Sequence, residues 1–229
     1  MARRLRYQVA MSLDGFIAGP SGEYDWIVMD PSIDFGALFK QFDTLVMGRK
    51  TYEPLLAQGG HGAQPGVDVV VFSRTLTAAT HPGVRIVSDD PRKVVADLKR
   101  QPGRDIWLFG GGELFRTLLS AGLVDSVEVA VMPVLIGEGI PLLPPGGTTT
   151  LKLVDHKILP KSGIAILAYA VPGGAGAPTI GFIKSPKPRA EKRASDVPSK
   201  KSGAKKKATQ TTAVKVKASG GERGARGTK

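Results

Sequence analysis

The chain has 229 residues, enough for one large domain or two small ones, and a formal net charge of +12. It contains no cysteine, which excludes disulfides, thiolate zinc sites, iron–sulfur clusters and cysteine nucleophiles. The three histidines have no ligand-like spacing, so we expect no metal site. No apolar run approaches the length of a membrane span, so we expect a soluble, cytoplasmic protein without membrane contact.

The positive charge is concentrated in the last quarter of the chain. Residues 1–172 hold 17 basic and 17 acidic residues, whereas residues 173–229 hold 15 basic and 3 acidic ones. The basic segment repeats Lys, Ala, Ser, Gly, Thr and Pro without apolar periodicity, and such a composition cannot bury enough surface to offset its ordering entropy. We therefore expect one folded domain over residues 1–172 and a disordered basic tail over residues 173–229.

Short apolar runs and helical patterns alternate along the first half of the domain. A strand is expected over Leu5–Met11, followed by a glycine-rich loop that runs to Trp26. Apolar residues then recur at helical spacing, at Phe35, Leu38, Phe39 and Phe42, with Asp34 or Ser32 as the N-cap. Two buried strands are expected next, over Thr44–Met47 and Val67–Phe72.

The second half continues the alternation and ends in strands. Asp90 before Pro91 predicts a helix start, and the buried face of that helix would consist of Val94, Val95 and Leu98. A further helix would bury Leu114, Phe115, Leu118 and Leu119 and end at Gly122. The expected strands are Ile106–Phe109, Val127–Val131, Leu151–Ile158 and Ile164–Val171, the last two forming a hairpin. This order predicts an α/β domain with a mixed, mostly parallel sheet flanked by helices on both faces.

The most informative motif is a strand that leads through three glycines into a helix, Asp105-Ile-Trp-Leu-Phe-Gly110-Gly111-Gly112-Glu113-Leu114. Glycines let the backbone pass close to a ligand, and the free N–H groups of a helix start suit a diphosphate. The usual dinucleotide fingerprint is incomplete, because Phe115 stands where its third glycine would be. A glycine-rich tight turn is the alternative, and we expect Gly111 to be a ligand-contact glycine.

Two further strand ends carry groups that suit phosphate. Gly48-Arg49-Lys50-Thr51 follows the strand that begins at Thr44, with a helix expected to start around Thr51. Ser73 and Arg74 follow the strand that ends at Phe72 and could hold the 2′-phosphate that distinguishes NADPH from NADH. Each segment has an ordinary alternative: Arg49 and Lys50 could be a surface basic pair beside a helix cap, and Ser73 and Arg74 could form a solvated turn. Three phosphate-suited strand ends in one domain nevertheless favour a nucleotide site.

At this point the chain resembles a known family. Gly48-Arg-Lys-Thr51-Tyr-Glu53 and Phe109-Gly-Gly-Gly-Glu-Leu-Phe115 are similar to the cofactor segments of dihydrofolate reductase. Met11-Ser-Leu-Asp14-Gly15-Phe-Ile17-Ala18 and the segment from Met132-Pro133 through Gly137-Glu-Gly139-Ile-Pro141 more closely resemble the reductase domain of the riboflavin-pathway deaminase–reductase. The resemblance covers residues 3–171 in the right order and implies a dihydrofolate reductase-like fold with NADPH as cofactor.

The resemblance also implies a role for each matching residue. Ala10 and Ile17 would offer backbone groups to the nicotinamide carboxamide, and Gly48, Arg49 and Thr51 would hold phosphates of the adenine half. Ser73 and Arg74 would meet the 2′-phosphate. The diphosphate would be lined by Gly110, Gly111, Gly112, Glu113 and Leu114. The protein would then orient NADPH for hydride transfer.

The substrate side offers two candidate catalytic carboxylates, Asp14 and Asp34. Dihydrofolate reductases place an acidic residue shortly after the Trp, at the start of the first helix. Here Trp26 is followed by Asp30 and Asp34, and Asp34 stands at the matching helix start, where it could equally be an ordinary N-cap. Asp14 lies in the Ser-x-Asp-Gly loop and could orient substrate or close a turn.

The resemblance implies a stand-alone NADPH-dependent reductase of a pteridine- or pyrimidine-like small molecule, similar to 5-amino-6-(5-phosphoribosylamino)uracil reductase. Gln8 stands where the riboflavin-type enzymes carry a Lys that binds the ribosyl phosphate. A true dihydrofolate reductase is the alternative enzyme. We also expect a homodimer paired through sheet edges near Val127–Val131 and Ile164–Val171. From another class, the basic tail could contact nucleic acid non-specifically, or serve only as a solubilising extension.

Overall fold

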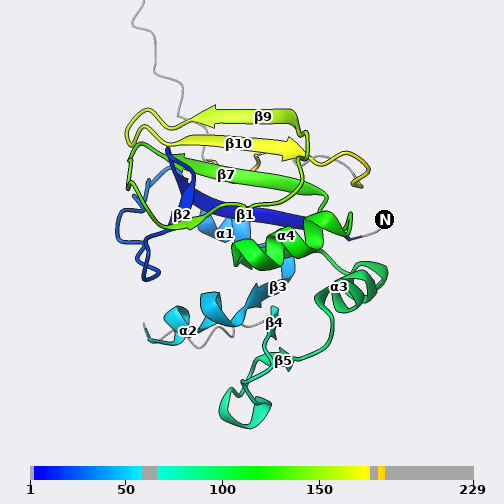
Figure 1. Ribbon diagram of the computed structural model, residues 1–229. Coiled ribbons are helices and arrows are strands. Elements are labelled where there is room, and N and C mark those ends of the chain that lie inside the picture. The colour runs from blue at the N-terminus through cyan, green and yellow to red at the C-terminus, as the bar shows by residue number, and fades with distance from the viewer. Residues whose placement is uncertain (1–2, 58–65, 176–179, 184–229) are drawn as a thin grey trace, which may run out of the picture. The chain divides into compact units, whose positions relative to one another are not determined.

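The computed structural model describes residues 3–57, 66–175 and 180–183, and Figure 1 shows its ribbon. Its main sheet has eight strands in the order β5-β4-β3-β6-β1-β7-β10-β9. They are β1 (Leu5–Ser12), β3 (Phe42–Gly48), β4 (Asp68–Phe72), β5 (Arg85–Val87), β6 (Asp105–Gly110), β7 (Ser126–Met132), β9 (Lys152–Ile158) and β10 (Ala165–Ala170). A small second sheet pairs β2 (Phe16–Ala18) with β8 (Ile140–Pro141).

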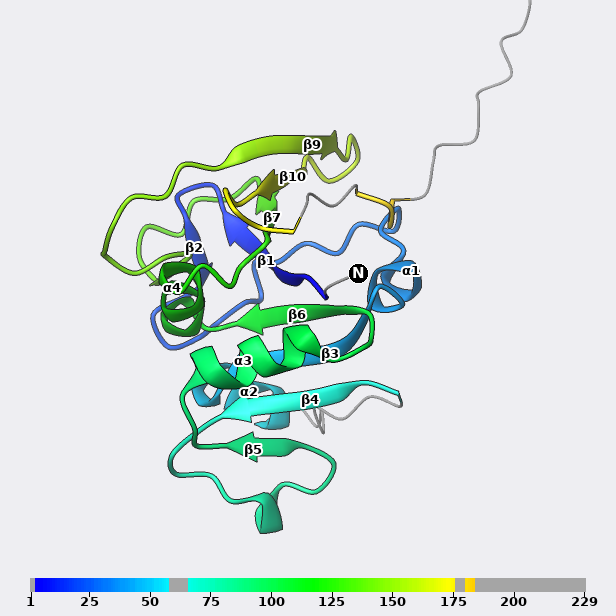
Figure 2. The same ribbon diagram turned by 90° about the vertical axis from the view of Figure 1, so that its right-hand side faces the viewer.

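The main sheet is mixed, as the sequence predicts. The six strands from β5 to β7 are parallel, β10 runs antiparallel between β7 and β9, and β9 and β10 form the expected hairpin. Figure 2 shows β4, β5 and β6 pointing the same way, and β3 pairs in parallel with β4 and β6. The carboxyl ends of the parallel strands therefore share one edge of the sheet.

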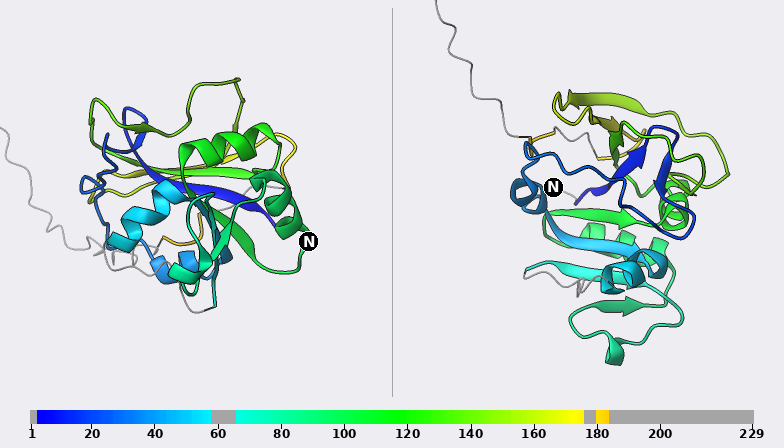
Figure 3. Two further views of the ribbon diagram at one scale, coloured as in Figure 1. Left: turned by 60° about the horizontal axis from the view of Figure 1, so that its bottom comes forward. Right: turned by 90° about the vertical axis from the view of Figure 1, so that its left-hand side faces the viewer.

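Helices cover both faces of the sheet (Figure 3). On one face lie α3 (Pro91–Arg100) and α4 (Gly112–Ser120), and on the other lie α1 (Phe35–Phe39) and α2 (Arg49–Ala57). The starts of α1 and α3 match the expected caps, because the side chains of Asp34 and Asp90 accept the backbone N–H groups of Ala37 and Arg92. None of the helices in the described ranges has both the length and the apolar character needed to cross a membrane.

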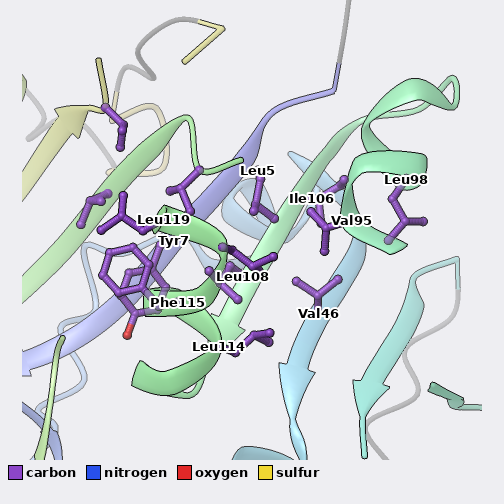
Figure 4. Packing of buried hydrophobic residues seen from close by; sticks show 14 of the residues in the cluster. Leu5, Tyr7, Val46, Val95, Leu98, Ile106, Leu108, Leu114, Phe115 and Leu119 are labelled. Carbon is purple, nitrogen blue, oxygen red and sulfur yellow. The ribbon is translucent and has the colours of Figure 1, made fainter. Parts of the chain in front are cut away.

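The core under α3 and α4 is closely packed (Figure 4). It combines the apolar faces expected for both helices with the strand residues below them: Leu5, Tyr7, Val46, Val95, Leu98, Ile106, Leu108, Leu114, Phe115, Leu118 and Leu119. The ring of Tyr7 stacks on that of Phe115 at 3.9 Å between centroids. This packing fixes α4 over β1 and β6, and so fixes the glycine loop that begins the helix.

The core on the opposite face includes residues beyond the expected domain boundary. Ile180 and Phe182 are buried there with Leu38, Trp107 and Ile166. The backbone of Ile180 is held by the side chains of β9, since its N–H donates to Asp155 (2.9 Å) and its carbonyl accepts from Lys157 (2.7 Å). Packed residues therefore occur beyond residue 172, among residues 180–183, whereas the rest of the expected disordered tail from residue 184 on lies outside the described residues.

Several sequence-based expectations are wrong in detail. Phe42 does not extend the first helix, because α1 ends at Phe39 and Phe42 begins β3, where it is fully buried. The second helix starts at Arg49 rather than around Thr51. The strands expected at the sheet edges, β7 and β10, are interior, and the edge strands are β5 and β9.

Candidate active site

The parallel sheet opens between β1 and β6 at its carboxyl edge. The ladder between these strands ends at the pair Tyr7–Leu108, whereas β1 continues beside β7 to the pair Ser12–Met132. The chain leaves β6 directly into α4 on one face, whereas it leaves β1 through β2 before it reaches α1 on the other face. This is a topological switch point, the place where open α/β sheets bind ligands beyond the carboxyl ends of their strands.

The backbone of Ala10 faces this opening. The carbonyl of Arg4 accepts from Ile106 on β6, and the carbonyl of Gln8 accepts from the indole N–H of Trp107 at 2.9 Å. Alternate residues of an extended strand direct their backbone groups to the same side, so the N–H and carbonyl of Ala10 also point towards β6. The ladder has already ended there. The geometry therefore leaves Ala10 free to hydrogen-bond a planar amide such as a nicotinamide carboxamide.

The glycine loop lies beside this opening, at the end of β6. The first bond of α4 runs from the N–H of Phe115 to the carbonyl of Gly111 at 2.9 Å. The N–H groups of Gly112, Glu113 and Leu114 therefore have no partner within the helix. Three such donors at the positive end of a nine-residue helix have the chemistry that suits an anion such as a diphosphate.

Gly111 has the backbone conformation of a turn glycine, and its expected contact with a ligand stays a prediction. Its φ of +94° and ψ of 108° form a conformation that L residues rarely adopt. A Cβ there would meet Thr51 Oγ1 at an ordinary 3.5 Å. The backbone conformation by itself therefore favours glycine here, and the neighbouring protein atoms leave room for a Cβ. Gly112 is the tightly packed member of the loop, because its Cβ would approach the carbonyl oxygen of Pro141 on β8 to 2.9 Å.

The second expected phosphate segment lies against the glycine loop. Met47 on β3 pairs with Gly110 on β6, and a Cβ on Gly110 would come within 2.9 Å of the Thr51 methyl group. Thr51 sits in the first turn of α2, so the two helix starts adjoin, while the space around the Cα of Gly48 is open. The exposed side chain of Arg49 forms an ion pair with Glu53 at 3.1 Å.

The third segment divides into a structural residue and an exposed one. Ser73 is buried, and its Oγ accepts the backbone N–H groups of Thr75 (3.1 Å) and Leu76 (3.0 Å), so this hydroxyl organises the turn after β4. Arg74 is exposed, and its guanidinium forms no ion pair with any of the described residues. Of this pair, Arg74 is the residue free to meet a phosphate.

The candidate catalytic carboxylates are both engaged with backbone N–H groups. Asp34 Oδ1 accepts from Ala37 at 2.9 Å and caps α1. Asp14 accepts from Gly137 at 2.8 Å and from Ile136 at 3.1 Å, across the loop that follows β7. Ile17, the other expected nicotinamide contact, lies in the middle of β2 beside β8. Asp34 thus caps its own helix, whereas Asp14 joins two loops that are far apart in the sequence.

The carboxylate that stands out in the structure is Asp30. It is buried, its Oδ1 accepts the N–H and hydroxyl of Ser32, and its Oδ2 makes no hydrogen bond of normal geometry within the described residues. The nearby hydroxyls of Ser162 and Ser32 lower the pKa of Asp30 to about 2. Ser162 lies in the β9–β10 turn, where Gly163 contacts Pro133 just after β7. Asp30 is therefore an ionised acceptor at the carboxyl edge.

On sequence grounds Asp34 is preferred to Asp30 because Asp34 stands at the start of the first helix, although neither residue has the spacing from Trp26 that is usual in dihydrofolate reductase. The burial of the Asp30 side chain would have singled it out as a candidate. That burial could not be read from the sequence, because Ser162, which lies near Asp30, is more than a hundred residues away in the chain. No cluster of three or more His, Asp or Glu side chains with the geometry of a metal site occurs in the described part of the chain.

With this geometry established, comparisons identify the family. The model of the RibD C-terminal domain matches residues 3–162. The chain belongs to the RibD C-terminal domain family. A relative of this RibD-type chain is the uncharacterised protein YyaP of Bacillus subtilis, which is 34% identical over 179 residues, spanning 73% of this chain and 94% of YyaP. The resemblance drawn from the sequence motifs is thereby confirmed, and the family is that of a riboflavin-type reductase domain.

Solved structures agree with this assignment. A putative riboflavin biosynthesis protein from Shewanella sp. PV-4 superposes with a TM-score of 0.63 at 26% identity, covering 75% of this RibD-type chain and 99% of its own. Dihydrofolate reductase from Enterococcus faecalis, complexed with NADP(H) and RAB-propyl, superposes with a TM-score of 0.55 at 18% identity, covering 75% of this chain and 99% of its own. The fold is dihydrofolate reductase-like, as predicted.

Proposed function

We propose that this RibD-type chain is an NADPH-dependent reductase that transfers a hydride to a pteridine- or pyrimidine-like small molecule. The observation that carries the proposal is the sheet opening between β1 and β6. The backbone groups of Ala10 and the N–H groups that begin α4 lie at the same edge of the sheet, beyond the last pair of the β1–β6 ladder. A dinucleotide with one amide-bearing ring and a diphosphate matches both sets of groups.

The residues present fit NADPH. Ala10 and Ile17 would hold the carboxamide, and the starts of α4 and α2, including Thr51, would hold the diphosphate and the adenine-side phosphate. Arg74 would form a charged hydrogen bond with the 2′-phosphate, whereas Ser73 would only shape the turn. When bound, the cofactor supplies the hydride, and the protein supplies orientation and electrostatic stabilisation.

Asp30 is our candidate for the substrate-facing carboxylate, in place of Asp14 and Asp34. With a pKa of about 2 it stays ionised at neutral pH, so it would accept hydrogen bonds from substrate N–H groups rather than donate a proton. Amino-substituted pyrimidine and pteridine rings present such donors. Gln8 offers a second buried acceptor, since its Oε1 has no hydrogen-bond partner within the described residues.

A substrate panel tests this assignment and separates it from the alternative enzyme. Purified protein with NADPH is offered 7,8-dihydrofolate, aminopyrimidines with and without a ribosyl phosphate, and oxidised flavin, and the loss of NADPH absorbance is followed. Turnover of an aminopyrimidine or pteridine that falls at least tenfold in Asp30→Asn supports the proposal. Turnover of dihydrofolate alone makes the chain a dihydrofolate reductase, and activity that survives Asp30→Asn removes Asp30 from the site.

We also propose a homodimer, now paired through β9. Among the described strands β9 has a neighbour on one side only, β10, so its outer backbone groups are available to a second copy. Its side chains Leu153, Val154 and Ile158 are 48%, 39% and 60% exposed. A sheet edge with three exposed apolar side chains is a surface that a protein normally covers.

The proposed nucleic-acid contact depends on basic residues that lie outside the described part of the chain. Binding would show as a salt-dependent shift of a DNA duplex, because phosphate contacts release counterions. The deletion that tests it should begin at residue 184, since removal of residues 180–183 would also remove buried core side chains. A shift that persists in the truncated chain would exclude the tail as its source.

A further inference from the structure

Asp14 joins two loops that border the proposed cofactor site. One loop follows β1, and the other, residues 133–139, follows β7. The carboxylate of Asp14 accepts the N–H groups of Ile136 and Gly137, and beside it the N–H of Leu13 donates to the carbonyl of Val134 at 2.8 Å. These hydrogen bonds join residues more than a hundred positions apart in the sequence and hold the two loops together as one unit. We call the bonds from Ile136 and Gly137 to Asp14, with the Leu13–Val134 bond, the clamp.

The joined loops continue into a second, small sheet. Beyond the clamp, β2 pairs with β8 through Ala18 and Ile140, and the N–H of Leu142 donates to the carbonyl of Gly15 at 2.9 Å. The chains approach so closely that a Cβ on Gly139 would collide with the carbonyl oxygen of Ala18. The position of β2, and of Ile17 within it, is therefore set by its contacts with β8.

The strand β8 also contacts the other half of the site. The carbonyl oxygen of Pro141 lies 2.9 Å from the position of a Cβ on Gly112, the first residue of α4. One short strand thus touches both the segment that carries Ile17 and the start of the helix that carries the free N–H groups. If β8 moves, the distance between these two segments changes.

We propose that Asp14 is a positioning residue: its carboxylate fixes residues 133–142 and thereby sets the spacing between the segment of Ile17 and the diphosphate loop. The inference rests on the proposed function, because it is in cofactor binding that this spacing matters. Direct substrate chemistry is a poorer account of Asp14, since both carboxylate oxygens already lie within hydrogen-bond reach of backbone N–H groups. The neighbouring Ser12 hydroxyl, with these N–H groups, lowers the pKa of Asp14 and keeps it charged.

The test compares Asp14→Ala and Asp14→Asn with a matched control, Asp90→Ala. Asp90 is also a carboxylate that accepts a backbone N–H, but it caps α3, where it contacts neither loop. Hydrogen exchange at Gly137 and Leu142 reports the clamp and its transmission to β8, and fluorescence titration with NADPH reports the site. The melting temperature reports the cost to stability that a merely structural role would produce.

We expect Asp14→Ala to speed exchange at Gly137 and Leu142 at least tenfold and to weaken NADPH binding at least tenfold. Asp14→Asn should have a smaller effect, because its amide oxygen can still accept. Asp90→Ala should lower the melting temperature by a similar amount while leaving NADPH affinity unchanged.

Two outcomes overturn the inference: exchange at Leu142 that is unchanged in Asp14→Ala, or faster exchange with unaltered NADPH affinity. Failure of the unmodified protein to bind NADPH is a different result, since it contradicts the proposed function. In that case hydrogen exchange alone tests the role of Asp14. Exchange at Leu142 that is as slow in Asp14→Ala as in the unmodified protein rejects the inference.

Discussion

Gly111 shows how one backbone conformation shapes the proposed diphosphate site. Because its φ is +94°, substitution should strain the turn whether or not a cofactor is bound. We predict that Gly111→Ala lowers the free energy of unfolding of the protein without cofactor by about 1 kcal/mol or more. Urea unfolding would measure this. A variant as stable as the unmodified protein, yet unable to bind NADPH, would instead make Gly111 a direct ligand contact.

Asp30 links the substrate side to the pH dependence of stability. Its folded-state pKa of about 2 lies below the ordinary value of 3.8, so the charged form is favoured in the folded protein. The stabilisation is therefore present above about pH 4 and is lost as the pH falls towards 2. Asp30→Asn should be less stable than the unmodified protein at pH 6, and the difference should shrink across this window. A constant difference from pH 6 to pH 2 would contradict the assignment.

At the scale of elements, the β9 edge carries the prediction on assembly. Ile158 is 60% exposed on this edge, so Ile158→Asp places a charge where the second copy would pack. We predict that the protein is a dimer by light scattering at micromolar concentration and that Ile158→Asp is a monomer. Phe35→Asp, on the exposed surface of α1, is the control and should remain dimeric. A monomeric unmodified protein would refute the proposal.

The longer elements could be predicted from sequence and the short ones could not. The strand–helix alternation, the caps at Asp34 and Asp90 and the β9–β10 hairpin depend on local patterns that the chain displays. The strands β2, β5 and β8 have only two or three residues, too few to show a period, and they exist because distant backbone pairs with them. Phe42 fits a helical spacing, but burial in the sheet decides its place.

In the candidate site, too, some features could be predicted from local sequence and others could not. The glycine loop and the residues Thr51 and Arg74 could be singled out because strand ends and helix starts leave local signals. The engagement of Asp14 with Ile136 and Gly137, and the burial of Asp30 near Ser162, join parts of the chain that are far apart in sequence. Such contacts depend on strand order, which no local pattern determines, so Asp30 could be proposed only once the fold was known.

For the whole molecule, a buried ion pair ties β1 to β7. Arg6 donates to both carboxylate oxygens of Glu128 at 2.6–2.7 Å, and both side chains are 2% exposed. Removing one partner leaves a buried charge, although Asp105 and Gln41 still contact Arg6. We predict that Glu128→Ala costs about 3 kcal/mol in urea unfolding. Asp97→Ala, which breaks an exposed pair with Arg100, should cost about 0–1 kcal/mol. Equal losses of unfolding free energy in the two variants would show that the buried pair stabilises the fold no more than the exposed pair does.

The central claim is that the carboxyl edge of this sheet binds NADPH, with Arg74 at its 2′-phosphate. Fluorescence titration of the unmodified protein and of Arg74→Ala with NADPH and NADH tests it most directly, with Arg85→Ala as a control for loss of an exposed arginine on the neighbouring strand. The account predicts a preference for NADPH, a loss of about 1.5–3 kcal/mol of NADPH affinity in Arg74→Ala, and unchanged NADH affinity. Absence of NADPH binding, or equal losses for both cofactors, would contradict it.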